Sequence, residues 1–313
     1  GTSRKAQAMR PRRPSDLGTA CEMTAFFITI ATTVTIYLLF AGFGRWGVQT
    51  SWAITLNYFV AAGLGWMLAG GVPAMGDALE APWIGPLAAL GLAFYPLFRL
   101  TAKCSQELGV SVATVATKLS MAIPVLVFAL HDGWAGLGLG QWLGLGLAFP
   151  AVWLSAMDGT STRPAGQGRL SMAWMPVVMF LGSGTIDTMF GWYTDDPTMD
   201  APGMQMAFAS VPFTLGGMVG LLDQWRSAAP RPRRKDILAG AALGVVNFGS
   251  LFFLLRVFDG GLLQRSMVVP TLNLSVIVLA TLVGVLAFKD IPGKKARWGV
   301  TLAALAIGAM MAL

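Results

Sequence analysis

The sequence predicts an all-α polytopic membrane protein, with ten transmembrane helices arranged as two inverted repeats of five helices. Of its 313 residues, 55% are hydrophobic and only 12% are charged, whereas a soluble domain carries about 25% charged residues. The apolar residues form continuous runs of about 20 residues, long enough to cross a hydrocarbon layer of ~30 Å as a helix. Strands of a membrane β-barrel would instead alternate apolar and polar residues over ~10 residues. These observations favour helices and exclude the barrel.

Ten apolar spans follow one another along the chain, joined by short connections rich in glycine, proline and charge. They are expected near residues 24–43, 52–69, 83–102, 109–130, 138–157, 173–193, 204–222, 237–257, 263–288 and 298–313. No connection between them is long enough to hold a soluble domain. Residues 1–22 are polar and basic and lack apolar periodicity, so we expect a disordered or non-native tail there. They contain no short apolar core with a small-residue cleavage site, as a targeting peptide would.

The polar segment 158–172 lies at the midpoint and is expected to link two five-helix repeats, residues 23–157 and 173–313. A weak internal similarity supports this division, because Arg99 and Arg256 each precede a short polar turn and another long apolar helix. Five is an odd number of crossings, so the second repeat enters the membrane from the opposite side. Transporters with inverted repeats of this kind bind substrate near the bilayer midplane, between the halves.

Three segments of the chain carry a pattern that is familiar as a set. In residues 268–313, the helix "VVPTLNLSVIVLATLVGVLAF" leads into "KDIPGKKARW" and a last apolar helix. The segments "NYFVAAGLGW" (57–66) and "FLGSGTIDTMF" (180–190) complete the set. Together they resemble the drug/metabolite transporter superfamily in its ten-helix, EamA-like form, although Asp290 stands where that family usually has glutamate. The resemblance implies a secondary carrier of small metabolites, in a superfamily that handles amino acids, sugars, nucleotide-linked sugars and drugs.

Lys118 is a charged residue in the middle of the predicted fourth span. At ~1.5 Å per residue it lies ~14 Å from Gly109, about half of the hydrocarbon core. A charged lysine at this depth costs ~3 kcal/mol or more against lipid. Ser111, Thr114 and Thr117 share its helix face, so this polar stripe is predicted to face the interior of the bundle. We expect Lys118 to line a substrate cavity, where it attracts an anionic group or takes part in proton coupling. The alternative is a lysine held in a helix–helix contact.

Asp187 is the natural counter-charge to Lys118. It lies in the predicted sixth span, about two turns from its end, and shares a face with Ser183, Gly184 and Thr188. We expect Asp187 either to pair with Lys118 or to carry a proton during transport. The alternative is a carboxylate close enough to the membrane surface to be hydrated.

Uncharged polar residues in other spans are further candidates for substrate binding. They are Asn57 and Tyr58 in the second span, Asn247 in the eighth and Asn273 in the ninth, together with Thr114 in the fourth. They come from both predicted repeats, as a site between the halves requires. Each of them has an alternative role in an interhelical hydrogen bond, which contributes ~0.6 kcal/mol in membrane proteins.

Two prolines are predicted to bend helices beside these candidates. Pro124 follows Lys118 by six residues, and Pro270 precedes Asn273 by three. Proline removes a backbone donor and weakens the helix locally, and in a transporter the freed carbonyls can face a cavity. A kink without any ligand is the alternative at either position.

Enzymatic chemistry is not expected, and neither is a cofactor. His131 is the only histidine, and no cluster of Cys and His has metal-ligand spacing, so no metal site is predicted. The glycine run at 136–146 lacks the third glycine and the preceding strand of a dinucleotide site. No serine–histidine or paired-carboxylate constellation is visible. The net charge of +7 resides in loops such as 231–236 and 289–298, which is typical of membrane topology rather than of nucleic-acid binding.

Basic residues gather in the loops that follow odd-numbered spans, for example in 226–235 and 289–297. The positive-inside rule therefore predicts that these loops are cytoplasmic and that both termini are outside. Members of the family are commonly described with both termini inside, and the basic segment 1–22 would agree with them. We favour the orientation that the loops predict.

The sequence as a whole predicts a secondary active transporter of a small polar or amphipathic metabolite. It would be a multi-pass protein of the plasma (bacterial inner) membrane that works by alternating access, driven by a proton gradient or by exchange. The expected partners are a small-molecule substrate and the lipid bilayer, without nucleic acid, and the chain could be a monomer or a homodimer. A non-transporting scaffold or assembly protein is one alternative. A lipid-carrier flippase, with a lateral opening and a basic headgroup pocket near one interface, is another.

Overall fold

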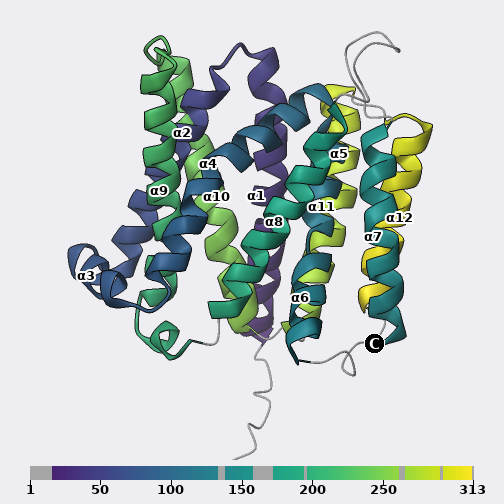
Figure 1. Cartoon of the computed structure of the whole chain (residues 1–313), viewed down its shortest axis with the longest axis horizontal. Coiled ribbons are helices and arrows are strands. Elements are labelled where there is room, and N and C mark those ends of the chain that lie inside the picture. Colours follow the sequence, from purple (N-terminus) through teal and green to yellow (C-terminus); the bar gives the residue numbers. More distant parts are fainter. Residues whose placement is uncertain are drawn as a thin grey trace, which may run out of the picture.

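The computed structural model describes residues 16–132, 138–157, 172–193, 196–260, 265–289 and 292–311. Helices account for nearly all of these residues, and no strand occurs among them. The helices run side by side in one bundle (Figure 1). Within the described part of the chain, six helices are long and apolar enough to cross a membrane by length and composition. The chain therefore has the all-helical character of a membrane protein.

The helices are named in chain order, as labelled in Figure 1. They are α1 (Asp16–Arg45), α2 (Thr50–Ala69), α3 (Val72–Glu80), α4 (Ile84–Glu107), α5 (Val110–Leu119), α6 (Ala122–Asp132), α7 (Leu139–Met157), α8 (Trp174–Tyr193), α9 (Met204–Arg226), α10 (Arg234–Gly260), α11 (Arg265–Phe288) and α12 (Lys294–Met311), with a 3₁₀ turn at Pro197–Asp200. The start of α1 and the end of α12 lie at the same end of the bundle (Figure 1). That end is opposite the one where α9 passes into α10.

A helix covers each predicted span, so the helical fold class is confirmed, with three differences. The first helix begins at Asp16 rather than near residue 24. The fourth span is divided into α5 and α6. A short helix, α3, was not predicted from the sequence. Residues 1–15 of the predicted tail and 158–171 of the predicted linker lie outside the described residues.

The short helix α3 exists because two glycines turn the chain sharply at the end of α2. Gly70 has a φ of 114° and donates its N–H to the carbonyl of Trp66, which ends α2. Gly71 follows with a φ of 74° and precedes α3, whose first turn contains proline. Residues other than glycine rarely adopt such φ angles. Ala74 and Ala78 are the buried residues of α3, and they join an apolar cluster with Trp83 and Phe208.

Two large apolar cores hold the helices together. In one, α2 packs between α9 and α10, and α4 packs on α9. In the other, α5 packs against α8 and α11, and α7 packs along the length of α12. α1 contacts α10 and α11 and so takes part in both cores.

Polar contacts join the α1–α2 turn to the start of α10. Asp236 is fully buried and accepts hydrogen bonds from the backbone N–H groups of Gln49 (2.8 Å) and Arg233 (2.8 Å). Arg233 also forms an ion pair with Asp236 and donates to the carbonyl of Gly47 (2.7 Å). Trp52 donates its indole N–H to the carbonyl of Pro230 (2.8 Å). Together these contacts hold the α1–α2 connection against the connection that leads from α9 into α10.

Candidate functional site

The break between α5 and α6 is the local feature around which the candidate site is built. α5 ends at Leu119, and α6 begins at Ala122 with Pro124 in its first turn. A proline ring clashes with the carbonyl four residues earlier, here that of Ser120, and offers no N–H to it. The carbonyl of Ser120 instead accepts the N–H of Ile123 (2.9 Å). The bend predicted beside Pro124 is therefore present, as a full interruption of the helix.

Side chains form hydrogen bonds with the backbone carbonyls at this break. Ser120 donates its hydroxyl to the carbonyl of Thr117 (2.6 Å). Asn273, from α11, donates its side-chain N–H to the carbonyl of Lys118 (3.1 Å) and contacts the sulfur of Met121 (3.3 Å). Because an unpaired carbonyl costs free energy away from water, these two side chains stabilise the interruption. Asn273 thus lies beside Lys118, as a common site requires.

Asp187 lies at the same level, facing the break from α8. Its carboxylate is 3.1 Å from the hydroxyl of Ser120. Ser120 is two residues after Lys118, so this contact brings Asp187 to the level of Lys118. The two charged side chains are close enough to interact electrostatically, but they form no ion pair within 4.0 Å.

Neither charged residue is fully buried. The side chain of Lys118 is half-buried and that of Asp187 is exposed. α8 packs against α4, α5 and α6 around Asp187, and Gly184, one turn earlier, contacts Ile123 of α6 so closely that a Cβ atom would clash. The charged groups are therefore held between helices without being sealed.

A fourth helix contributes to the site through a pair of hydroxyls. Tyr37 of α1 shares a hydrogen bond with Thr117, one turn of helix before Ser120. Thr117 also donates toward the carbonyl of Ala113 (2.9 Å). The helix-break site, which we define as Tyr37, Thr117, Lys118, Ser120, Asp187 and Asn273, therefore draws on α1, α5, α8 and α11.

The side chains of the other predicted site residues do not take part in the helix-break site. Thr114 is fully buried and donates to the carbonyl of Val110, within its own helix. Asn57 of α2 accepts a hydrogen bond from Asn247 of α10 (3.2 Å), and both are buried. Tyr58 is buried among phenylalanines and donates to the carbonyl of Phe94 (2.8 Å). Asn57, Tyr58 and Asn247 belong to the packing between α2, α4 and α10, apart from the helix-break site.

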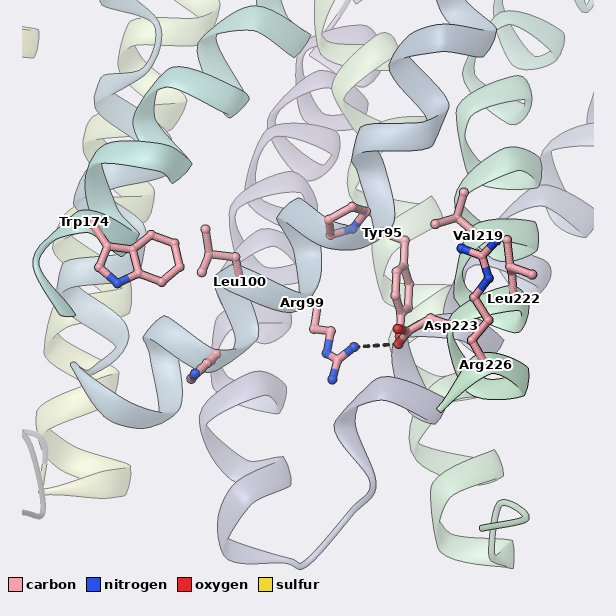
Figure 2. Close-up of a pocket in the computed structure, with 10 residues that line it drawn as sticks. Tyr95, Arg99, Leu100, Trp174, Val219, Leu222, Asp223 and Arg226 are labelled. Atoms are coloured by element: carbon pink, nitrogen blue, oxygen red, sulfur yellow. Dashed lines mark hydrogen bonds and ion pairs between the residues drawn. The ribbon is translucent and has the colours of Figure 1, made fainter. Parts of the chain in front are cut away.

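Sequence reasoning missed a groove that is lined by residues of α4, α8 and α9. It has a volume of about 440 Å³ and lies between α8 and α9, with α4 as its floor (Figure 2). Arg99 forms an ion pair with Asp223, which also accepts a hydrogen bond from the hydroxyl of Tyr95 (2.8 Å). Lys103 and Arg226 line the same groove. The available signal was weak, because charges near helix ends are ordinary.

Comparison with known proteins bears on the fold more than on the chemistry. No family model matches the chain. An uncharacterized protein of Haemophilus influenzae is 25% identical over 214 residues, and the match covers 64% of this chain and 66% of the relative. The chain therefore spans just under two thirds of that relative's length. A solved crystal structure of a protein is similar over 93% of this chain and 96% of its own, with a TM-score of 0.53 and 19% identity. At that identity the likeness concerns the fold alone.

Proposed function

We propose that the protein is a secondary active transporter of a small polar or amphipathic metabolite, a multi-pass plasma-membrane member of the EamA-like transporters. The observation that carries the proposal is the helix-break site, where Lys118 lies in the last turn of α5 and Asp187 of α8 faces the interruption that follows it. Interrupted helices line substrate and ion sites in many transporters, because their free ends provide polar groups at depth. Ionisable residues at such depth are rare and mark pathways for substrates or protons.

The packing of the helices supports the two inverted five-helix repeats of this proposal. If α1, α2, α4, α5–α6 and α7 correspond to α8, α9, α10, α11 and α12, several of the main contacts between helices have a counterpart. The contact of α2 with α10 corresponds to that of α9 with α4, and the contact of α1 with α11 to that of α8 with α5. The pairs α2–α9 and α7–α12 correspond to themselves. The helix-break site takes α1 and α5 from one half and α8 and α11 from the other.

The hydroxyl of Ser120 provides a route by which protonation of Asp187 is felt by the helix break. A serine hydroxyl has one hydrogen to donate, yet its oxygen lies near both the Thr117 carbonyl and the Asp187 carboxylate. When Asp187 is ionised, the Ser120 hydrogen is drawn to the carboxylate. When Asp187 is protonated, its own hydrogen is donated to Ser120, and Ser120 donates to Thr117. Proton binding therefore changes the hydrogen bonding of a backbone carbonyl at the interruption.

In this mechanism Lys118 binds an anionic group of the substrate, and Asp187 competes with that group for the ammonium. Protonation of Asp187 removes the competing charge, so substrate and proton bind together. Rocking of the two halves would then expose the site to the other side of the membrane. The ammonium of Lys118 and the anionic group of the substrate neutralise each other, and this lowers the free-energy cost of moving the substrate across the hydrocarbon core.

A thermal-shift screen of the purified full chain against metabolites tests the proposal. Compounds with a carboxylate or phosphate should include one that raises the melting temperature. The variant Lys118→Ala should weaken that compound's binding by about thirtyfold or more, because losing one partner of a buried charge pair costs ~2 kcal/mol or more. The matched control, Lys294→Ala, removes an exposed lysine at the start of α12 and should bind normally. Absence of any hit across these classes, or equal binding by Lys118→Ala, would favour the scaffold alternative.

A further inference from the structure

The groove on α4 combines a basic rim with an apolar wall. Three cationic side chains line it, Arg99, Lys103 and Arg226, against the single carboxylate of Asp223, which gives a net charge of +2. Its apolar lining comes from Pro96, Leu100, Val219, Leu222 and Trp174. Its volume of about 440 Å³ is within the usual range of ~300–1,000 Å³ for ligand sites.

Within the part of the chain that the structure describes, some charged side chains of the groove have partners of opposite charge, and others do not. The carboxylate of Asp223 is already neutralised by Arg99 and hydrogen-bonded by Tyr95, which in turn accepts from Gln224 (2.9 Å). Lys103 and Arg226 are exposed, and no hydrogen bond or ion pair of their side chains is found within the described residues. Two cations are therefore left to face whatever occupies the groove.

The basic residues of the groove lie near helix ends, beside exposed apolar side chains. Arg226 is the last residue of α9, and Lys103 is one turn from the end of α4. Trp174, at the start of α8, is 52% exposed, and Leu222 is 42% exposed. In Figure 2, Trp174 and Leu222 stand on opposite sides of the groove, with α4 between them. Tryptophan at a helix end beside basic residues is typical of the headgroup region of a bilayer.

We propose that this groove binds one anionic glycerophospholipid, with its phosphate between Lys103 and Arg226 and an acyl chain along Leu100, Val219 and Leu222. Basic pockets between transmembrane helices bind acidic lipid headgroups in this way. The apolar wall distinguishes a lipid from a free phosphate, because a small anion would leave the wall without a partner. The bound lipid fills the gap between α8 and α9, which both pack on α4 but contact each other little. The groove is separate from the helix-break site, and the proposal does not rest on transport.

Lipid titration of the purified full chain tests this site. The melting temperature would be followed while phosphatidylglycerol or phosphatidylcholine with the same acyl chains is added, and native mass spectrometry would count retained lipids. Phosphatidylglycerol should stabilise the protein more and remain bound. The double variant K103Q/R226Q should lower its affinity about thirtyfold, since each basic side chain contributes ~1 kcal/mol toward an acidic membrane lipid and 1.4 kcal/mol is tenfold.

Control measurements separate the possible outcomes. The double variant K294Q/R297Q removes the same charge from exposed positions at the start of α12 and should bind phosphatidylglycerol normally. Glycerol 3-phosphate, a soluble source of the same headgroup chemistry, should not stabilise the protein at equal concentration. The proposal is overturned if the two lipids act equally, if K103Q/R226Q binds as well as the unchanged protein, or if glycerol 3-phosphate replaces the lipid. If the double variant has a lower melting temperature than the unchanged protein without lipid, K103Q and R226Q are measured singly. Unchanged affinity for phosphatidylglycerol in both single variants then overturns the proposal.

Discussion

The sector formed by α2, α9 and α10 and the sector around the helix-break site are built in opposite ways. In the first, continuous helices approach so closely that glycine is needed between them. Gly244 of α10 faces α2, where a Cβ atom would lie 2.8 Å from the carbonyl oxygen of Asn57. In the second, a helix is interrupted, the side chains of Ser120 and Asn273 bond its backbone carbonyls, and Gly184 meets a side chain, that of Ile123, rather than a backbone. The contrast indicates a rigid sector that holds the fold and a second sector that is free to change its hydrogen bonding.

Energetically, the two sectors should respond differently to substitution. Close helix packing through small residues is a main source of stability inside a membrane, where the hydrophobic effect does not drive helices together. Single interhelical hydrogen bonds contribute less, ~0.6 kcal/mol on average. Substitutions in the α2–α9–α10 sector should therefore reduce stability, and substitutions at the helix-break site should mainly alter binding.

The largest effect is expected for Asp236→Ala, which removes the clamp between the α1–α2 turn and α10. Two backbone N–H groups and the Arg233 guanidinium would lose their acceptor. Because buried donors without a partner cost ~1–3 kcal/mol each and part of this loss is recovered by hydration, we expect a loss of about 2–4 kcal/mol in unfolding free energy. Unfolding of the purified protein by denaturing detergent measures it. Asp77→Ala, which removes an exposed carboxylate of α3, is the control. Equal effects of the two variants would mean that the clamp contributes no stability.

Gly244→Ala should have the next largest effect, about 1–3 kcal/mol, the usual cost of overpacking. Its Cβ atom would also lie 2.7 Å from the Cβ of Val60, so two helix backbones have to separate. Gly63→Ala is the matched control, because nothing lies within 4 Å of a Cβ atom there and alanine is the better helix former. The same detergent unfolding experiment compares them. A Gly244→Ala variant as stable as Gly63→Ala would show that α2 and α10 are not tightly packed.

The two sectors also differ in how far the sequence predicted them. Lys118 and Asp187 were identifiable because a charge inside an apolar run is costly and demands a reason. The contact of Asp187 with Ser120 was not predictable, because it depends on how α8 crosses the bundle. Pro124 interrupts its helix, whereas Pro212 lies inside the continuous α9, so proline alone does not decide the outcome.

At Pro124, the interruption of the helix depends on a hydrogen-bond partner that is distant in sequence. Asn273 of α11 captures the carbonyl of Lys118 from 155 residues away. Asn57 and Asn247 showed the same residue type in the sequence, yet they bond to each other in the rigid sector. Polar residues at depth were thus predictable as candidates, but their division between two sectors follows from tertiary packing. The groove was not predictable for the same reason, since Arg99 and Asp223 are 124 residues apart.

The smallest change in stability, with a clear change in binding, is expected for Asp187→Asn. The side-chain amide keeps an oxygen that can accept from Ser120, so the unfolding free energy should change by less than about 1 kcal/mol. The amide side chain that this substitution introduces is neutral at every pH, as the protonated side chain of Asp187 is. Binding of an anionic ligand to Lys118 should therefore be independent of this carboxyl and remain at the strong level that the unchanged protein reaches when Asp187 is protonated.

Titration of ligand affinity against pH measures this difference, with a stabilising ligand from the metabolite screen. In the unchanged protein, affinity should fall as pH rises and Asp187 ionises, because the carboxylate then competes for the ammonium of Lys118. Asp187→Asn should remove this fall, while Asp77→Asn, at the surface of α3, should keep it. If Asp187→Asn retains the same pH dependence, the coupling proton binds elsewhere. If it instead destabilises the fold as strongly as Gly244→Ala, the helix-break site belongs to the rigid part of the molecule, and the distinction between the two sectors fails.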